Sequence, residues 1–120
     1  MMLDPNIQES TLLDRLNAMM VNNYECVGVY DNGKLIGISG LWFLTKYYVG
    51  QHVEPDNVII HLDYQSKGIG DRLMQWIFDY AKEKGCIASE LNCYVSNDRG
   101  LKFWERHGYK TIGYHMQKKL

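Results

Sequence analysis

The chain has 120 residues and a mass of 14.0 kDa, which suits one domain, residues 1–120, and is too small for two. Apolar residues make up 46% of the chain and charged residues 22%, which excludes a disordered protein and predicts a packed core. The formal net charge of -1 excludes a broad basic surface of the kind that binds nucleic acid.

We expect no targeting segment in this sequence. No stretch approaches the roughly 18 consecutive apolar residues of a membrane helix, and the first residues carry neither the basic nor the apolar region of a secretory signal. The three cysteines, Cys26, Cys86 and Cys93, are an odd and sparse set, typical of reduced thiols in a cytosol. We therefore expect a cytoplasmic protein that binds neither membrane nor nucleic acid.

The first part of the chain predicts a helix and then an antiparallel hairpin. Residues 10–20 carry leucines and methionines at helical spacing, with a cap at Ser10 or Thr11. Residues 24–30 and 34–48 are rich in strand-forming side chains and are separated by an Asp-Asn-Gly turn. Because an Asn-Gly pair tolerates the positive φ angles of a tight turn, these two strands should pair as a hairpin.

The rest of the chain predicts alternating strands and helices. The expected elements are a strand at 58–62, a helix from 69 to a stop at Gly85, a strand at 86–95, a helix at 98–107 capped by Asn97 or Ser96 and stopped by Gly108, and a strand at 109–119. This order predicts an α/β fold, in which helices pack on one mixed sheet.

The junction between the 58–62 strand and the next helix is the most informative segment. Gly68 and Gly70 stand where the helix begins, and the first N–H groups of a helix have no partner within it. The helix dipole favours negative charge at this end, and glycines let phosphate oxygens approach the backbone. Lys67 and Arg72 would add positive charge. The loop thus predicts a phosphate or diphosphate site, with a plain strand-to-helix turn as the alternative.

Two blocks of sequence, in the expected order, resemble motifs of the GCN5-related N-acetyltransferases (GNAT). Residues 60–70, followed by Leu73 and Met74, resemble the family's motif A, Gln/Arg-x-x-Gly-x-Gly/Ala between a strand and a helix. Residues 97–109 resemble the family's later helix, Asn-x-x-Ala-x-x-Phe-Tyr-x-x-x-Gly-Phe. The resemblance covers about residues 24–120 and implies a GNAT-like fold that is shortened at its N-terminus.

The resemblance implies an enzyme that moves an acetyl group from acetyl-coenzyme A (acetyl-CoA) to a primary amine by direct attack. The diphosphate would lie on the glycine loop, the pantetheine arm along the backbone of 60–62, and the second helix beside the channel. The implied cofactor-binding residues are Ile60, His61, Leu62, Gln65, Ser66, Lys67, Gly68, Ile69, Gly70, Asp71, Asn97, Gly100 and Phe103. The 58–62 strand would splay from the 86–95 strand to open a slot for the thioester. For Asn97, a simple helix cap is the alternative.

Glu54 and Asp56 are the candidate catalytic residues, because an acceptor ammonium with a pKa of about 10.4 must lose a proton before it attacks. Counting back from Gln65 places Glu54 where a histone-modifying member of the family has its glutamate. Pro55 interrupts the expected strand, so two solvated loop carboxylates are the alternative. A backbone N–H near Ile60 would stabilise the oxyanion.

The sequence departs from the family pattern in two places. Trp104 stands where many relatives have a tyrosine that protonates the leaving thiolate, and an indole is no acid at neutral pH. We expect Trp104 to lie in the core, with Tyr94 or Tyr109 as candidate replacements. The N-terminal part provides about one helix, and residues 1–8 show no strand, which leaves an unpaired edge on the hairpin. This edge predicts a homodimer, with a monomer whose N-terminal segment folds back as the alternative.

Three further points complete the interpretation. The histidines at 52, 61, 107 and 115 show no metal-ligand spacing, so no metal is expected. A module that binds acyl-CoA without turnover, or a purely structural dimer subunit, is the alternative to an enzyme. The acceptor class stays open between small molecules and peptides, because acceptor pockets are built from variable loops.

Overall fold

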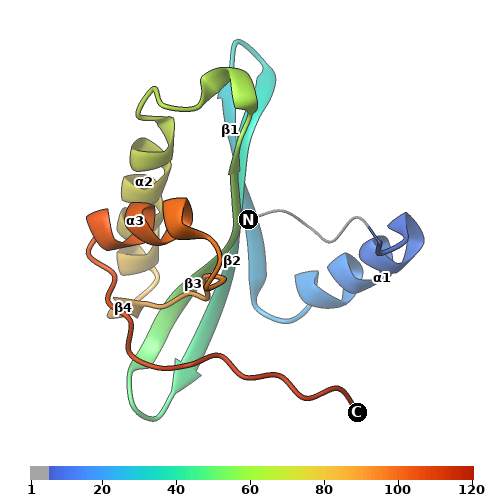
Figure 1. Ribbon diagram of the computed structural model, residues 1–120, viewed down its shortest axis with the longest axis vertical. Helices are drawn as coiled ribbons and strands as arrows, with labels where there is room; N and C mark the ends of the chain where they lie inside the picture. Colours follow the sequence, from blue (N-terminus) through green and yellow to red (C-terminus); the bar gives the residue numbers. More distant parts are fainter. Residues whose placement is uncertain (1–5) are drawn as a thin grey trace.

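Three successive antiparallel strands, at residues 24–31, 34–46 and 50–60, form the centre of the computed structural model, which describes residues 6–120 (Figure 1). In chain order the elements are α1 (Glu9–Met20), β1 (Tyr24–Asp31), β2 (Lys34–Lys46), β3 (Gly50–Ile60), the 3-10 turn η1 (Leu62–Tyr64), α2 (Ile69–Glu83), β4 (Ala88–Ser89) and α3 (Asp98–Arg106). The strand order is β1-β2-β3-β4, antiparallel except for the parallel pair β3-β4. The predicted mixed α/β sheet is confirmed.

The turn and stop signals of the sequence act as predicted. Asn32 and Gly33 join β1 to β2 with φ angles of 48° and 84°, the positive values that the turn requires. Gly85 and Gly108 follow α2 and α3 with φ angles of 94° and 91°. A glycine adopts this left-handed conformation without the steric cost that a side chain brings, so both helices end there.

The core lies between α2 and one face of the sheet. Buried side chains of α2 pack against Leu41 of β2 and Val53 of β3. These α2 residues are Leu73, Met74, Ile77 and Ala81. Trp76, which the helical spacing places on the same stripe, is instead 47% exposed and stacks on Tyr80, with 4.8 Å between ring centroids.

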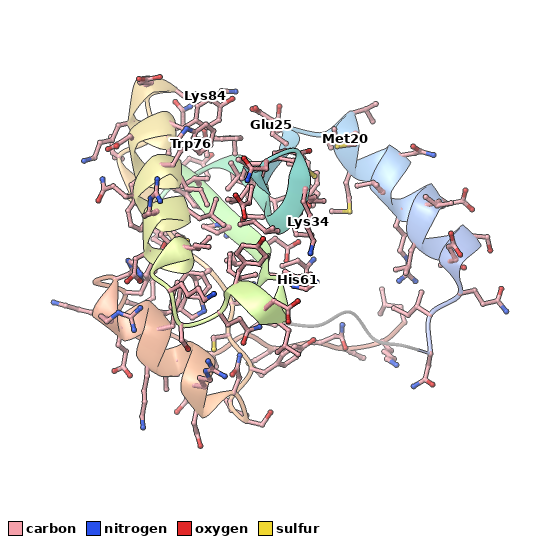
Figure 2. All side chains as sticks on the ribbon, turned by 90° about the horizontal axis from the view of Figure 1, so that it is seen from above. Met20, Glu25, Lys34, His61, Trp76 and Lys84 are labelled. Carbon is pink, nitrogen blue, oxygen red and sulfur yellow. The ribbon has the colours of Figure 1, made fainter. Side chains whose placement is uncertain are left out.

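Polar contacts fix the C-terminal end of α2 to the edge strand β1. Glu25 of β1 accepts hydrogen bonds from the Tyr80 hydroxyl and the Lys84 ammonium. Glu25 and Lys84 are labelled in Figure 2. The bond from Lys84, with that from Tyr80, holds the pKa of the Glu25 carboxyl below its usual range. These contacts link the last turn of α2 to the start of β1.

Strand β3 is longer than predicted, because Pro55 does not interrupt it. The expected strand at 58–62 is part of β3, which begins at Gly50, while Leu62 belongs to η1. The carbonyls of Gln51 and Val53 accept hydrogen bonds from the β4 side, from the N–H groups of residues 87 and 90. Backbone polar groups of residues two apart point to the same edge of a strand. The backbone nitrogen of Pro55, which carries no hydrogen, therefore points to the β4 edge, as the polar groups of Gln51 and Val53 do. No bond to β2 is lost.

Two predicted strands at the other end of the chain are wrong. The strand expected at 86–95 is reduced to Ala88–Ser89, and the one expected at 109–119 does not form. A strand needs a neighbour for its backbone groups, but β4 pairs with β3 at only two positions and the C-terminal segment runs away from the sheet (Figure 1). The Tyr109 and Ser89 hydroxyls, 2.6 Å apart, hold the start of this segment near β4.

Helix α1 forms as predicted but does not pack on the sheet. None of its residues is buried, and Figures 1 and 2 show it standing away from β1. It begins after Gln8, which makes no side-chain cap, so the predicted cap at Ser10 or Thr11 is wrong. Residues 6–8 form no strand, and the rest of the predicted strandless segment lies outside the described residues. Within the described part of the chain, no helix has the length and apolar character to cross a bilayer.

Ile77→Ala tests the assignment of the core. The Ile77 side chain is fully buried under α2, so its truncation should cost about 2–5 kcal/mol and lower Tm by roughly 8 °C or more in calorimetry. Ile112→Ala is the matched control, because Ile112 is 77% exposed in the C-terminal segment. Equal melting temperatures for the two variants would contradict this core.

Candidate active site

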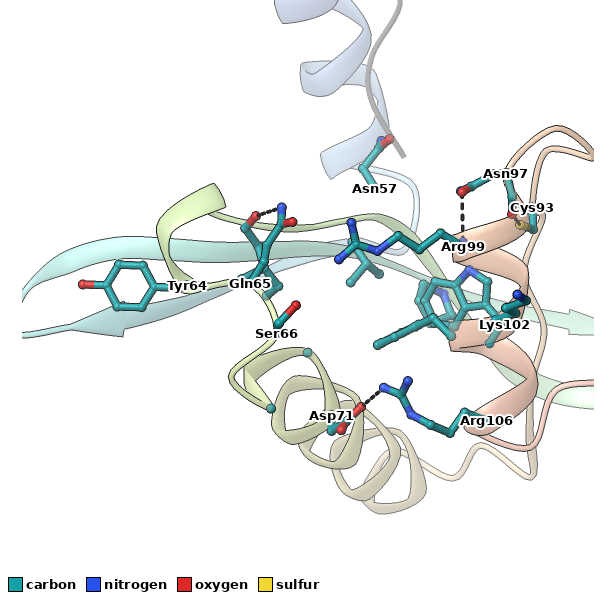
Figure 3. Close-up of a pocket in the computed structure, with 18 of the residues that line it drawn as sticks. Asn57, Tyr64, Gln65, Ser66, Asp71, Cys93, Asn97, Arg99, Lys102 and Arg106 are labelled. Carbon is teal, nitrogen blue, oxygen red and sulfur yellow. Dashed lines mark hydrogen bonds and ion pairs between the residues drawn. The ribbon is translucent and has the colours of Figure 1, made fainter.

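A cavity of about 680 Å³ lies between the end of β3, the loop before α2, and α3 (Figure 3). The cavity exists because β3 and β4 separate after two residue pairs. The two strands pair only at His52–Ala88 and Val53–Ser89. Beyond these pairs, Pro55 lines one side of the cavity, and Asn92 and Cys93 line the other. The splay expected between these strands is therefore present.

A β-bulge directs the end of β3 along this cavity. The pairing of β2 with β3 shifts between Ile38 and Gly40, where two residues of β3 lie opposite Ser39. One of these, Asn57, has a φ of 50°, and both Asn57 and Val58 line the cavity. A bulge bends its strand and re-aims its side chains, so the backbone beyond it diverges from the direction of β4.

The start of α2 has the open backbone geometry on which the predicted phosphate site depends. Gly68 is the N-cap residue with a φ of 78°, and it provides no side-chain cap. The first N–H that reaches an acceptor in this turn is that of Arg72, which bonds the Gly68 carbonyl at 3.1 Å, so the N–H groups of 69–71 precede the helical ladder. A Cβ at Gly68 would meet no atom within 4 Å. The helix end is thus sterically free and carries partial positive charge.

Helix α3 is locked against this helix end. A Cβ at Gly70 would lie 3.2 Å from the Phe103 ring, which is a tight contact, so any larger residue at this position would require the ring to shift. Asp71 accepts hydrogen bonds from Arg106 at 2.6 Å and His107 at 2.8 Å. The bond from Arg106, with that from His107, holds the pKa of the Asp71 carboxyl below its usual range. The negative charge of Asp71 is therefore neutralised by α3 rather than presented to the cavity.

Positive charge enters the cavity from α3, which the sequence interpretation missed. Arg99, Lys102 and Arg106 line the cavity (Figure 3), and their spacing of three and four residues places them on one helical face. This spacing of basic residues is visible in the sequence and could have predicted a cationic face on α3. Lys67 and Arg72, the predicted sources of charge, do not line the cavity, and the Lys67 ammonium lies 5.7 Å from the centroid of the Tyr64 ring.

Most of the predicted cofactor-binding residues come together around this cavity. Those that line it are Ile60, Gln65, Ser66, Gly68, Gly70, Asp71, Asn97, Gly100 and Phe103. His61, Leu62, Lys67 and Ile69 do not line it. Gln65 donates to the Ile60 carbonyl at 3.1 Å, which ties the glycine loop to the end of β3. The Asn97 side chain accepts from the Gly100 N–H at 2.9 Å, so it caps α3 as well as lining the cavity.

A second cavity of about 130 Å³ contains the two predicted catalytic carboxylates. Glu54 and Asp56 line it together with Trp42, and Pro55 and Asn92 line both cavities, so the two spaces adjoin. Both carboxylates belong to β3 and are half-buried, so the alternative of two solvated loop carboxylates is wrong.

The two carboxylates have different partners. Glu54 Oε2 lies 2.8 Å from His52 Nε2 and 3.3 Å from Lys46 Nζ, and the proximity of Glu54 raises the pKa of Lys46. Asp56 accepts a longer hydrogen bond, 3.4 Å, from the indole of Trp42. Glu54 is therefore the more firmly held carboxylate of the pair.

Neither candidate replacement for the usual tyrosine lines the cavities. Tyr94 is 68% exposed, and the hydroxyl of Tyr109 is held by Ser89, with burial raising its pKa. Trp104 packs against the core as predicted, with its ring centroid 5.5 Å from that of Tyr109, and it also lines the larger cavity. Tyr64 lines the cavity too, but its hydroxyl donates to Asp31 at 2.8 Å.

Comparison with curated proteins finds acetyltransferases. A probable spermine N(1)-acetyltransferase of Bacillus subtilis subsp. natto is 25% identical over 109 residues, which cover 88% of this chain and 72% of that protein. A probable N-acetyltransferase, camello, of Xenopus laevis is 27% identical over 108 residues, covering 86% of this chain and 47% of that protein.

Solved structures share the fold. AAC(6')-Iy, in complex with the bisubstrate analogue CoA-S-monomethyl-acetylneamine, gives a TM-score of 0.81 at 13% identity and covers 97% of this chain and 82% of its own. A putative acetyl transferase from Pyrococcus furiosus gives a TM-score of 0.80 at 17% identity, covering 98% and 83%.

The model of the acetyltransferase (GNAT) family matches residues 3–109, nearly the whole chain. Its two motifs coincide with the loop before α2 and with α3, which enclose the larger cavity. Members of this family use acetyl-CoA. The chain therefore belongs to the GNAT family of acetyltransferases.

Proposed function

We propose that this chain transfers an acetyl group from acetyl-CoA to the primary amine of a small molecule. The observation that carries the proposal is the arrangement of the two cavities. The larger one extends from the open helix end at Gly68 to the splay of β3 and β4, where it adjoins the cavity that contains Glu54. A long, diphosphate-containing donor and a separate acceptor then meet at the splay.

The residues around the larger cavity fit coenzyme A. Its diphosphate would accept hydrogen bonds from the free N–H groups of residues 69–71. Arg99 and Lys102 form no ion pair with any described residue, so both are available for phosphate groups. At 55–60, the edge of β3 that faces away from β2 has no strand of the described residues beside it, so its backbone groups are open to an arm that adds like a further strand.

The chemistry then needs few groups from the protein. Acetyl-CoA supplies an acetyl group that is activated as a thioester. Glu54 takes a proton from the acceptor ammonium, the amine nitrogen bonds to the acetyl carbon, and the carbon–sulfur bond breaks; the nitrogen then gives its second proton to the departing thiolate. A thiol with a pKa of about 8.5 leaves well as a thiolate, so the absence of a tyrosine at Trp104 is tolerated.

The smaller cavity supports a cationic acceptor. Two carboxylates, Glu54 and Asp56, attract an ammonium group, and Trp42 lines the same cavity as an aromatic neighbour for a cation. A volume of about 130 Å³ suits one end of a flexible aliphatic amine. The similarity to a probable spermine N(1)-acetyltransferase favours polyamines as the first acceptors to test.

Gly68→Glu tests the diphosphate site. The carboxylate would place negative charge at the helix end, so acetyl-CoA should no longer raise the melting temperature of this variant. Gly68→Ala is the matched control, because it carries the same strain at a φ of 78° without the charge, and its Cβ meets no atom within 4 Å. A full ligand-induced shift in Gly68→Glu would show that the diphosphate lies elsewhere.

Glu54→Gln tests the proposed base. Loss of the proton acceptor should lower kcat by about 100-fold or more while the affinity for acetyl-CoA is unchanged, measured by thiol release with spermidine and by calorimetry. Asp56→Asn should mainly raise the KM for the amine, because Asp56 is proposed to attract the cation. A Glu54→Gln enzyme with wild-type kcat would remove Glu54 from the mechanism.

We also propose a cytoplasmic homodimer. The three cysteines are free thiols, which suits a reducing compartment. Leu13, Leu16 and Met20 are between 38% and 53% exposed and lie on one face of α1. The sheet face opposite α2 exposes Leu35 and Ile38. Within one chain these two apolar surfaces do not cover each other. In a dimer, the α1 surface of one copy can pack on the sheet surface of the other.

Light scattering after size exclusion tests the dimer. We expect a mass of about twice 14.0 kDa, and a monomer for the double variant Leu16→Glu, Met20→Glu, since charge on α1 opposes burial of its apolar face. The matched control is Ala18→Glu, an exposed α1 position on the helix face opposite this apolar stripe. A wild-type mass of 14.0 kDa would contradict the dimer.

A further inference from the structure

His52 is a fully buried histidine whose two ring nitrogens both face acceptors. Its Nδ1 lies 3.1 Å from the Gly50 carbonyl oxygen, and its Nε2 lies 2.8 Å from Glu54 Oε2. A second carboxylate oxygen, Glu90 Oε1, lies 3.9 Å from the same Nε2 atom. A carbonyl oxygen only accepts hydrogen bonds, so Nδ1 must carry a proton, and a second positive group is then required between Nε2 and the Glu54 carboxylate.

The Nε2–Oε2 distance is that of a hydrogen bond, which favours a proton between the two atoms. Two ligands that share a tetrahedral zinc ion at about 2.0–2.1 Å lie roughly 3.3 Å apart, whereas 2.8 Å is the length of a charge-assisted hydrogen bond. Although His52, Glu54 and Glu90 place ligand atoms within 4.8 Å of one another, Glu90 also accepts a hydrogen bond from Tyr48, and Lys46 contacts Glu54. Two carboxylates around one buried ring balance the charge of an imidazolium.

We propose that His52 is a positioning residue for Glu54: the imidazolium fixes the carboxylate so that one oxygen faces the acceptor cavity. The inference rests on the proposed function. Both contacts of Glu54, from His52 and from Lys46, fall on Oε2. Glu54 Oε1 makes no hydrogen bond to any described residue and is not a fully buried atom. It is therefore the oxygen that takes the proton from the amine.

Nitrogen NMR of the full chain labelled with 15N-histidine tests the pair directly. At pH 7.5 the His52 ring should show two protonated nitrogens, and Glu54→Gln should convert it to a neutral ring with one. The four histidines are few enough to assign, and His52→Asn identifies the signal by its loss. A neutral His52 in the wild-type protein, or a divalent metal retained in equimolar amount, would overturn the inference.

Kinetics of a double-mutant cycle test the positioning. His52→Asn should lower kcat by about 10- to 100-fold with the KM for acetyl-CoA unchanged, and should have little further effect in the Glu54→Gln background. His115→Asn, an exposed histidine of the C-terminal segment, is the control that keeps the wild-type rate. Equal losses in both backgrounds would show that His52 acts independently of Glu54.

The outcomes separate this inference from the proposed function. A wild-type protein that acetylates no amine contradicts the proposed function and with it any role of His52 in the reaction. An active wild-type enzyme with a neutral His52 contradicts only the present inference. If His52→Asn does not fold, the ring signals of the wild-type protein and of Glu54→Gln decide the matter alone.

Discussion

The early separation of β3 from β4 is the constraint on which the rest of this structure depends. Two residue pairs join the strands, and beyond Val53 the N–H that would continue the ladder is missing because residue 55 is proline. The bulge at Asn57 then bends β3 further. A sheet that stayed paired would fill the space where the larger cavity lies and would cover the edge of β3.

The two sides of this separation have opposite electrostatic character. On one side, the free N–H groups of α2 and the cationic face of α3 provide positive potential. On the other side, Glu54 and Asp56 provide negative potential beside Trp42. An anionic donor and a cationic acceptor are therefore drawn to different cavities that adjoin at Pro55. The net charge of -1 conceals this division, because the opposite charges nearly cancel over the whole chain.

Local signals in the sequence predicted what depends on local geometry. The Asn-Gly turn, the stops at Gly85 and Gly108, and the open helix end at Gly68 follow from φ preferences and helix ends, and all are present. Pairing depends on distant partners and was harder to predict. The apolar pattern of 109–119 suits a strand, but no described strand lies beside it. Pro55, which was expected to interrupt β3, is tolerated because its missing N–H lies on the edge of β3 that pairs with no described strand there.

The central claim is that the helix end at Gly68 holds the diphosphate of acetyl-CoA, and a crystal structure of the chain with coenzyme A tests it most directly. We predict diphosphate oxygens within hydrogen-bond distance of the N–H groups of 69–71, and the thiol end between β3 and the segment after β4. Coenzyme A bound with its diphosphate away from this helix end, or a cavity that contains only water at saturating ligand, would contradict the account.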